Sequence, residues 1–178
     1  MRIISVLVSI VTLFFLCVGA APAQSAALAG LSIGDIINAL NIGLVERLHA
    51  IITLDTFVTN IISVDFDAKN PLPIELTIDR VVSSAGLNGT VFATFDRTFE
   101  KPVVVPIFGT KNSGVFGNVL LTKGVEASLD IIPFGVLDLI TADVYIRAGT
   151  IFGKLGIPIT LDGLQQSNIP TTYDLVLS

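Results

Sequence analysis

The stretch Val64–Val81, VDFDAKNPLPIELTIDRV, constrains the fold more than any other part of the chain. Apolar and polar side chains alternate over residues 62–67 and again over residues 74–79, which is the period-two pattern of half-buried strands. Between them, Pro71 and Pro73 lack backbone donors and force an extended corner. The stretch therefore predicts two strands joined by a sharp corner, as in an antiparallel β-sandwich.

Alternation continues through most of the C-terminal half. It predicts further strands over residues 91–96, 103–107, 137–147, 155–161 and 173–177. Pro106 marks an edge or a strand end, and a bulge near Ile140 and Thr141 reconciles two phases of alternation. Residues 118–132 are ambiguous and favour a short helix that ends at Pro133. The expected fold is mostly β, an immunoglobulin-like or fibronectin-like sandwich.

The N-terminus has the layout of a secretory signal peptide. Arg2 precedes an apolar run over residues 3–19, and small residues with Pro22 follow it. We predict a signal peptide at residues 1–23 and a secreted or cell-surface protein; the alternative is an uncleaved anchor that tethers the chain to a membrane. Because the single cysteine, Cys17, lies in this run, the mature chain would have no thiol for disulfides or catalysis.

Residues 26–51 change to helical spacing. Ser32 and Asp35 form a capping-box-like start, and apolar residues recur from Ile33 to Ile51 at intervals of three and four. We therefore divide the chain into the signal peptide, a helical segment at 24–52 and a β-sandwich domain at 53–178. The helix would pack on the sandwich or lead into it as a stalk; a membrane-surface helix is the alternative.

Composition limits the classes of partner. Hydrophobic residues make up 52% and charged residues 14% of the 178 residues, which favours a folded chain over disorder. The net charge of −5 and the lack of Lys/Arg runs argue against nucleic-acid binding.

Catalytic and metal-binding residues are scarce. His49 is the only histidine, and no Gly-x-Ser-x-Gly elbow supplies a nucleophile, so a Ser-His-Asp enzyme is not expected. One histidine without a mature cysteine does not make a zinc site. No cofactor fingerprint is present in the sequence, and we predict no cofactor.

Asp65 and Asp67 are the remaining candidates for chemistry. They fall on one strand face about 7 Å apart, a spacing at which two carboxylates bind Ca²⁺ or flank a sugar. A solvated outer face of the strand explains them more simply.

Asn88-Gly89-Thr90 is the only Asn-x-Ser/Thr sequon. In an exported chain it is a candidate N-glycosylation site, and Asn88 is also a typical turn residue that tolerates positive φ.

The segments VDFDAKNPLPIELTIDRV, AGLNGTVFATFDRTF and LDLITADVYIRAGTIFGKLGIPITLDGLQQSNIPTTYDL resemble the late embryogenesis abundant type-2 domain, the water-stress and hypersensitive-response (WHy) group. The hallmark is a strand ending in Asn70-Pro71, followed by a second strand and the Gly86–Gly89 turn. The chain is most similar to small exported fungal proteins with this domain. The resemblance implies an antiparallel sandwich, a stress or desiccation association and no catalytic residues.

The sequence thus predicts an exported, non-enzymatic protein for stress-related protection or structural interaction at the cell surface. Its partners would be cell-wall, lipid or membrane-surface components. The first alternative is a protein that binds lipid or another hydrophobic ligand. The second is a carboxylate-dependent hydrolase that uses Asp65 and Asp67.

Overall fold

The structure is a computed structural model that describes residue 38 and residues 42–176. Its elements, in chain order, are β1 (Val45–Thr53), α3 (Thr56–Thr59), β2 (Ile61–Lys69), β3 (Leu76–Leu87), β4 (Thr90–Val105), β5 (Thr110–Asn112), β6 (Phe116–Leu121), α4 (Gly124–Leu129), the 3-10 helix η1 (Ile132–Phe134), β7 (Val136–Ala148) and β8 (Ile157–Val176). Within these residues, no helix has the length and apolar character needed to cross a membrane.

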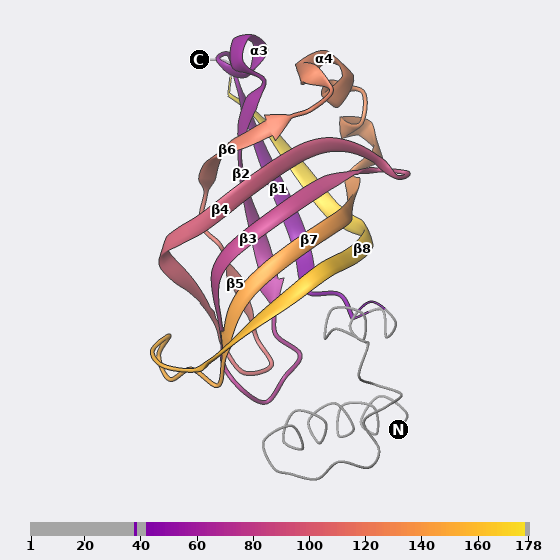
Figure 1. Cartoon of the computed structure of the whole chain (residues 1–178). Helices are drawn as coiled ribbons and strands as arrows, with labels where there is room; N and C mark the ends of the chain where they lie inside the picture. The colour runs from indigo at the N-terminus through magenta and orange to yellow at the C-terminus, as the bar shows by residue number, and fades with distance from the viewer. Residues whose placement is uncertain (1–37, 39–41, 177–178) are drawn as a thin grey trace.

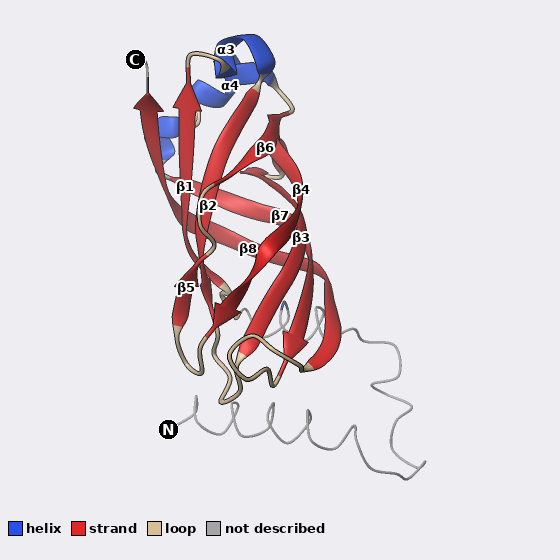
Figure 2. Ribbon diagram, turned by 90° about the vertical axis from the view of Figure 1, so that its left-hand side faces the viewer, coloured by secondary structure: helices blue, strands red, loops and turns tan. Residues whose placement is uncertain are grey.

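The strands form one sheet that closes on itself. Their order is β1-β8-β7-β3-β4-β6-β2, and β1 also pairs with β2, which makes a seven-stranded barrel (Figures 1 and 2). The short β5 pairs with Asp67–Lys69 at the end of β2, beyond the residues that pair with β6. The predicted sandwich is therefore wrong. Inward and outward residues alternate in the strands of both folds, so the alternation that predicts the strands does not distinguish them.

Closure depends on β1, which lies in the segment predicted as a helix. Val45–Thr53 is a strand that pairs antiparallel with β2 and parallel with β8. Leu48, Ala50 and Ile52 alternate inward along it, a pattern that helical spacing obscured in the sequence. The helix is wrong for this part, and the boundary at residue 52 falls inside β1. The earlier part of that helix and the signal peptide lie outside the described residues, except residues 38 and 42–44.

Several local predictions are confirmed. Asn88 and Gly89, with φ of 50° and 77°, form the two-residue turn between β3 and β4. The short helix predicted within residues 118–132 is confirmed only for α4, since residues 118–121 belong to β6 and Pro133 lies in η1. The register of β7 shifts between Leu139 and Ala142, which is the predicted bulge. Strand β4 ends at Val105, directly before Pro106.

Two predicted pairs of short strands are continuous in the structure. Residues 91–96 and 103–107 fall on β4, which has 16 residues, and the last two predicted strands fall on β8, which has 20. Strands this long wrap around the barrel, as Figure 1 shows for β4 and β8.

The Asn-Pro corner crosses one end of the barrel. Asn70 is almost fully buried; its side-chain amide donates to the carbonyl oxygens of Ile74 at 2.7 Å and Pro106 at 3.1 Å, and its oxygen accepts from the Leu72 backbone N–H at 2.9 Å. The corner thus links β2 and β3, which are not neighbours in the sheet. We call this the lower end of the barrel, as it is drawn in Figure 1; α3 and α4 lie at the upper end.

Candidate functional site: the barrel interior and its seam

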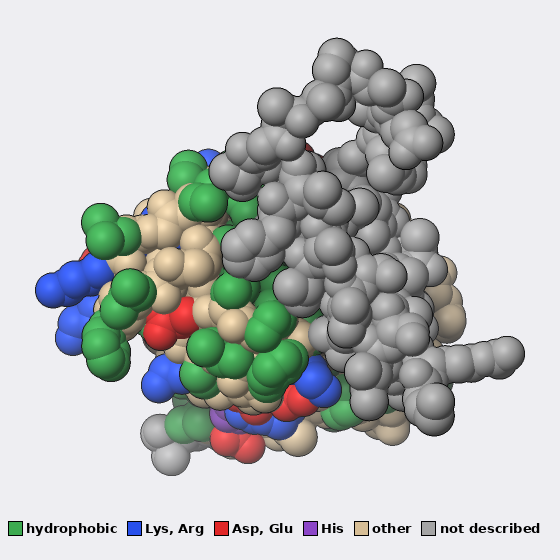
Figure 3. All heavy atoms as spheres, turned by 90° about the horizontal axis from the view of Figure 1, so that it is seen from below, with side chains coloured by type: hydrophobic (Ala, Val, Ile, Leu, Met, Phe, Trp, Pro, Cys, Tyr) green, Lys and Arg blue, Asp and Glu red, His purple; other side chains and the backbone are tan. Residues whose placement is uncertain are grey.

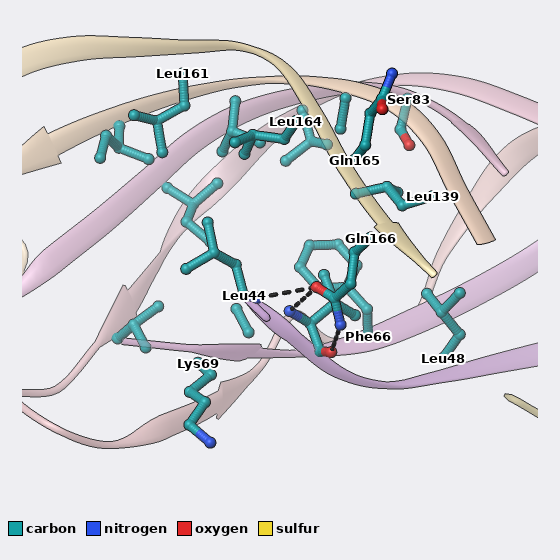
Figure 4. A pocket seen from close by; sticks show the side chains of 18 of the residues that line it. Leu44, Leu48, Phe66, Lys69, Ser83, Leu139, Leu161, Leu164, Gln165 and Gln166 are labelled. Atoms are coloured by element: carbon teal, nitrogen blue, oxygen red, sulfur yellow. Dashed lines mark hydrogen bonds between the residues drawn. The ribbon is translucent and has the colours of Figure 1, made fainter. Parts of the chain in front are cut away.

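The barrel interior contains a cavity near the lower end, which we call the lower cavity. Its volume is about 100 Å³, and its walls come from β1, β2, β3, β4, β7 and β8 (Figure 4). The wall is mainly apolar and includes Leu48, Phe66, Ile78, Val81, Ile146 and Leu161. Small inward residues, Ala85 and Ala142, leave space that larger side chains would fill.

Gln166 fixes the segment before β1 against β8 at this cavity. Its Oε1 accepts the backbone N–H groups of Leu44 at 2.9 Å and Val45 at 3.0 Å, and its Nε2 donates to the Val45 carbonyl at 2.6 Å (Figure 4). Because these bonds occupy the amide, Gln166 has a structural role at the rim.

A second cavity, the upper cavity, has a volume of about 70 Å³. Its wall is apolar apart from a few residues, one of which is Tyr173 on β8. The hydroxyl oxygen of Tyr173 is buried and has no hydrogen-bond partner among the described residues. Burial raises the pKa of Tyr173 to about 12, so the hydroxyl keeps its proton and remains a donor at neutral pH.

The two cavities lie against the same side chains. Leu48, Phe66, Ala85 and Phe95 line both. Phe66 packs edge-on against Phe116, with ring centroids 6.1 Å apart, and Phe95 lies 5.2 Å from the same ring. The aromatic cluster therefore borders both cavities.

On the outer surface, polar side chains gather where β1 closes the barrel. We call this group the seam cluster; it comprises Arg47, His49, Asp65, Asp67, Asn112 and Asp174. His49 bridges three strands, because its Nδ1 lies 2.7 Å from Asp65 Oδ2 on β2 and its Nε2 lies 3.1 Å from Asp174 Oδ2 on β8. Only the imidazolium donates from both ring nitrogens, so the geometry favours the charged form.

Asp65 is the centre of the seam cluster. It is only 5% exposed, so the solvated face predicted for it is wrong. Besides His49, it accepts from Asn112 Nδ2 at 2.8 Å and Arg47 Nη2 at 3.2 Å. The neighbouring β5 and its loop cover this part of β2, a long-range contact that the sequence pattern of β2 does not report.

The pKa values follow from these contacts. The hydrogen bond to Asp65 raises the pKa of His49, with Asp174 adding to the effect. Burial of Asp65 raises its pKa, but the bonds from Asn112 and His49 and the charge of Arg47 outweigh burial, so the pKa lies below its ordinary value. The hydrogen bond from Arg47 lowers the pKa of Asp67.

Asp65 and Asp67 do share one face, as predicted, but they meet through Arg47 and Asn112. A hydrolase needs one carboxyl that stays protonated near neutral pH. Lowered pKa values keep both carboxyls ionised, and the cluster has the form of an ion-pair network that joins strands. The described residues contain no group of three His, Cys, Asp or Glu side chains arranged to hold a metal ion.

Asn88 is exposed at the tip of the β3–β4 hairpin. Its backbone N–H donates to Asp138 Oδ2 at 3.2 Å, and the turn carries its positive φ. The turn role is confirmed, and glycosylation stays a prediction.

The interior cavities and Tyr173 are the features that sequence reasoning missed. Their sequence signal is the presence of small residues, Ser83, Ala85 and Ala142, at inward positions of strands. That signal becomes readable only when the pairing of the strands is known.

A scan against protein-family models found no family that matches the chain, and a search of curated proteins found no matching relative. The resemblance to the late embryogenesis abundant type-2 domain stays a prediction.

Proposed function

We propose that the barrel binds a small apolar molecule that carries a single hydrogen-bond acceptor. The observation that carries this proposal is the pair of apolar cavities together with the unpartnered hydroxyl of Tyr173. Binding sites for small molecules in proteins are apolar hollows with a few polar groups that fix orientation. This corresponds to the hydrophobic-ligand alternative of the sequence analysis.

The energetics favour occupancy by an apolar ligand. Unfilled apolar space costs stability, because side chains around it lose packing contacts. A buried hydroxyl without a partner adds a desolvation cost that a ligand acceptor would remove. An apolar molecule with a carbonyl or hydroxyl oxygen near Tyr173 offsets both costs.

Ligand size follows from the volumes. Each cavity by itself is smaller than the apolar cavity of about 150 Å³ that binds benzene, so a ligand with an aromatic ring needs the space of both. Rotation of Phe66 or Phe95, which line both cavities, would join them for a longer ligand. We therefore expect the site to bind an apolar molecule of one or two aromatic rings that occupies the joined space.

The experiment measures binding of 2-naphthol by its fluorescence. Ser83→Leu places a larger side chain in the lower cavity and should weaken binding about tenfold or more, because a close-packed interior has little room to adjust. Ser84→Leu is the matched control on the opposite face of β3, and it should bind as the wild type does. Equal binding by both variants would overturn the proposal.

Tyr173→Phe tests the polar group separately. The variant should bind 2-naphthol about fivefold more weakly, which corresponds to the loss of one neutral hydrogen bond. Naphthalene, which has no acceptor oxygen, should bind the variant and the wild type alike. Equal losses for the two probes would show that Tyr173 acts only through packing.

A further inference from the structure

The loop between β7 and β8, residues 149–156, exposes large apolar side chains. Ile151 is 65% exposed, Phe152 89% and Leu155 80%. A backbone bridge between Ile151 and Lys154 makes the loop a tight hairpin, which we call the tip loop. Apolar side chains at this exposure gain little from packing against the described residues, and a protruding group of them marks a candidate interaction site.

The tip loop is held firmly in place. Arg147 donates from Nη1 to the carbonyls of Gly153 and Leu155, both at 3.0 Å, and it forms an ion pair with Asp79 at 2.8 Å. Glu75 accepts from the Gly153 backbone N–H at 2.9 Å and from the Thr150 hydroxyl at 2.7 Å. Partly buried polar bonds therefore fix a loop whose apolar side chains face solvent.

The backbone of the tip loop is strained at two of the exposed residues. Phe152 and Leu155 have φ of 50° and 60°, in the left-handed region that bulky side chains rarely adopt. Strain of this kind persists where the surrounding structure enforces it, and it clusters at functional sites. The strain here positions Phe152 and Leu155 outward.

A second apolar tip lies at the same end of the barrel. Ile107 and Phe108, on the loop after β4, are both more than half exposed, and Phe108 is tied by its backbone N–H to the Leu72 carbonyl at 3.1 Å. Figure 3 views this lower end and shows hydrophobic side chains gathered there, with Lys and Arg as well as Asp and Glu side chains beside them. The sequence places Lys154 within the tip loop and Lys111 three residues after Phe108.

We propose that the lower end of the barrel docks on an anionic lipid bilayer by inserting Phe152 and Leu155. Protruding apolar tips flanked by lysines fit an interface in which acyl chains lie beneath anionic headgroups. The lower cavity reaches toward this same end, where Ala68, Leu76 and Ile146 line it. The inference rests on the proposed function in that docking would place the ligand cavity next to the bilayer, in which apolar ligands dissolve.

The chain contains no tryptophan, so a single Phe152→Trp substitution reports on the tip loop alone. With vesicles of phosphatidylcholine and phosphatidylserine, its emission should shift to shorter wavelength, because the indole leaves water for the interface. Val58→Trp, at an 85% exposed position on α3 at the upper end, is the matched control and should not shift. Equal shifts, or none, would overturn docking through the tip loop.

Vesicle sedimentation with the full chain measures the contribution of the loop to affinity. The double variant Phe152→Ser, Leu155→Ser should bind about tenfold or more weakly, because two large apolar side chains no longer enter the bilayer. The double variant Leu54→Ser, Val58→Ser at the upper end should bind like the wild type. The apolar N-terminal run is common to all these proteins, so it does not contribute to the difference.

Lys154→Gln tests whether the tip loop prefers an anionic bilayer to a neutral one. It should weaken binding to the anionic vesicles about fivefold and leave binding to phosphatidylcholine vesicles unchanged. A loop-dependent dimer in light scattering, without loop-dependent vesicle binding, would instead identify a second copy as the occupant and overturn the proposal. The tip-loop variants keep the cavities, so 2-naphthol binding is a separate measurement. If neither the wild type nor any of these variants bound 2-naphthol, only the ligand proposal would be refuted.

Discussion

The two faces of β1, the strand that closes the barrel, differ in how closely they contact the neighbouring strands. On the inner face, Leu48 and Ala50 border cavities that the fold leaves partly empty. On the outer face, Arg47 and His49 enter a dense network of hydrogen bonds with carboxylates from β2 and β8. The strand is thus loosely packed inside and tightly bonded outside.

The difference indicates where closure is specified. Apolar contacts are non-directional, so the inner face by itself does not fix the register of β1. The outer ion pairs are directional and place His49 between Asp65 and Asp174 in one register only. A barrel whose closing strand is fixed from outside retains interior volume without losing its shape.

The largest expected effect breaks the outer network. Asp65→Ala removes the acceptor shared by Arg47, His49 and Asn112, while Asp67 still accepts from Arg47 and Asn112 and Asp174 still pairs with His49. We expect the free energy of unfolding to fall by about 2 kcal/mol, because charge-assisted hydrogen bonds to a buried carboxylate are lost. Chemical denaturation measures it directly.

Asp96→Ala is the matched control, since Asp96 pairs with Arg80 on the exposed outer face of β3 and β4. Loss of an exposed pair should cost about 0.5 kcal/mol. If the two variants were equally stable, the seam cluster would not be what fixes β1.

A smaller change in the free energy of unfolding tests the inner face, and its sign should differ between two alanines. Ala85 lines both cavities, and Ala85→Val should raise the free energy of unfolding by about 1 kcal/mol by filling space. Ala148 is buried but lines neither cavity, and Ala148→Val should lower it by about 1–3 kcal/mol through overpacking. Destabilisation by both substitutions would mean that the interior is already filled to its limit.

The sequence predicted the local elements well because their signals are local. The alternation in β2 and β3, the Asn88-Gly89 turn and the bulge near Ile140 depend only on neighbouring residues. Closure depends on β1 meeting β8 across more than a hundred residues, and no local pattern encodes that pairing. The sandwich was wrong for this reason, and the helix was wrong because helical spacing obscured the alternation of β1.

The candidate site shows the same limit. The sequence brought Asp65 and Asp67 forward as a pair, yet the partners that set their chemistry, Arg47 and Asn112, come from β1 and β5. The sequence predicted only a strand at residues 173–177, and the unpartnered hydroxyl of Tyr173 is visible only in the closed barrel. The sequence thus indicated which residues could carry chemistry, but it did not indicate which side chains they contact.

The smallest expected effect is a pH dependence that sharpens the contrast between the two faces. The pKa of His49 is raised in the folded protein, so its stabilisation is complete below its ordinary value near 6.5 and is lost as pH rises through the raised value. The pKa values of Asp65 and Asp67 are lowered, so their stabilisation is lost only as pH falls below about 3.8. The seam therefore holds β1 best between these limits.

His49 is the only histidine, so its imidazole resonances can be followed by NMR without assignment ambiguity. We expect a folded-state pKa above 6.5, and a free energy of unfolding that declines as pH rises from 6.5 toward 8. In His49→Gln this decline should disappear, while the loss of stability at acidic pH, which depends on Asp65 and Asp67, should remain. An imidazole that titrates at or below 6.5 would show that His49 is neutral in the seam, and closure would then rest on Arg47, whose charge does not change in this range.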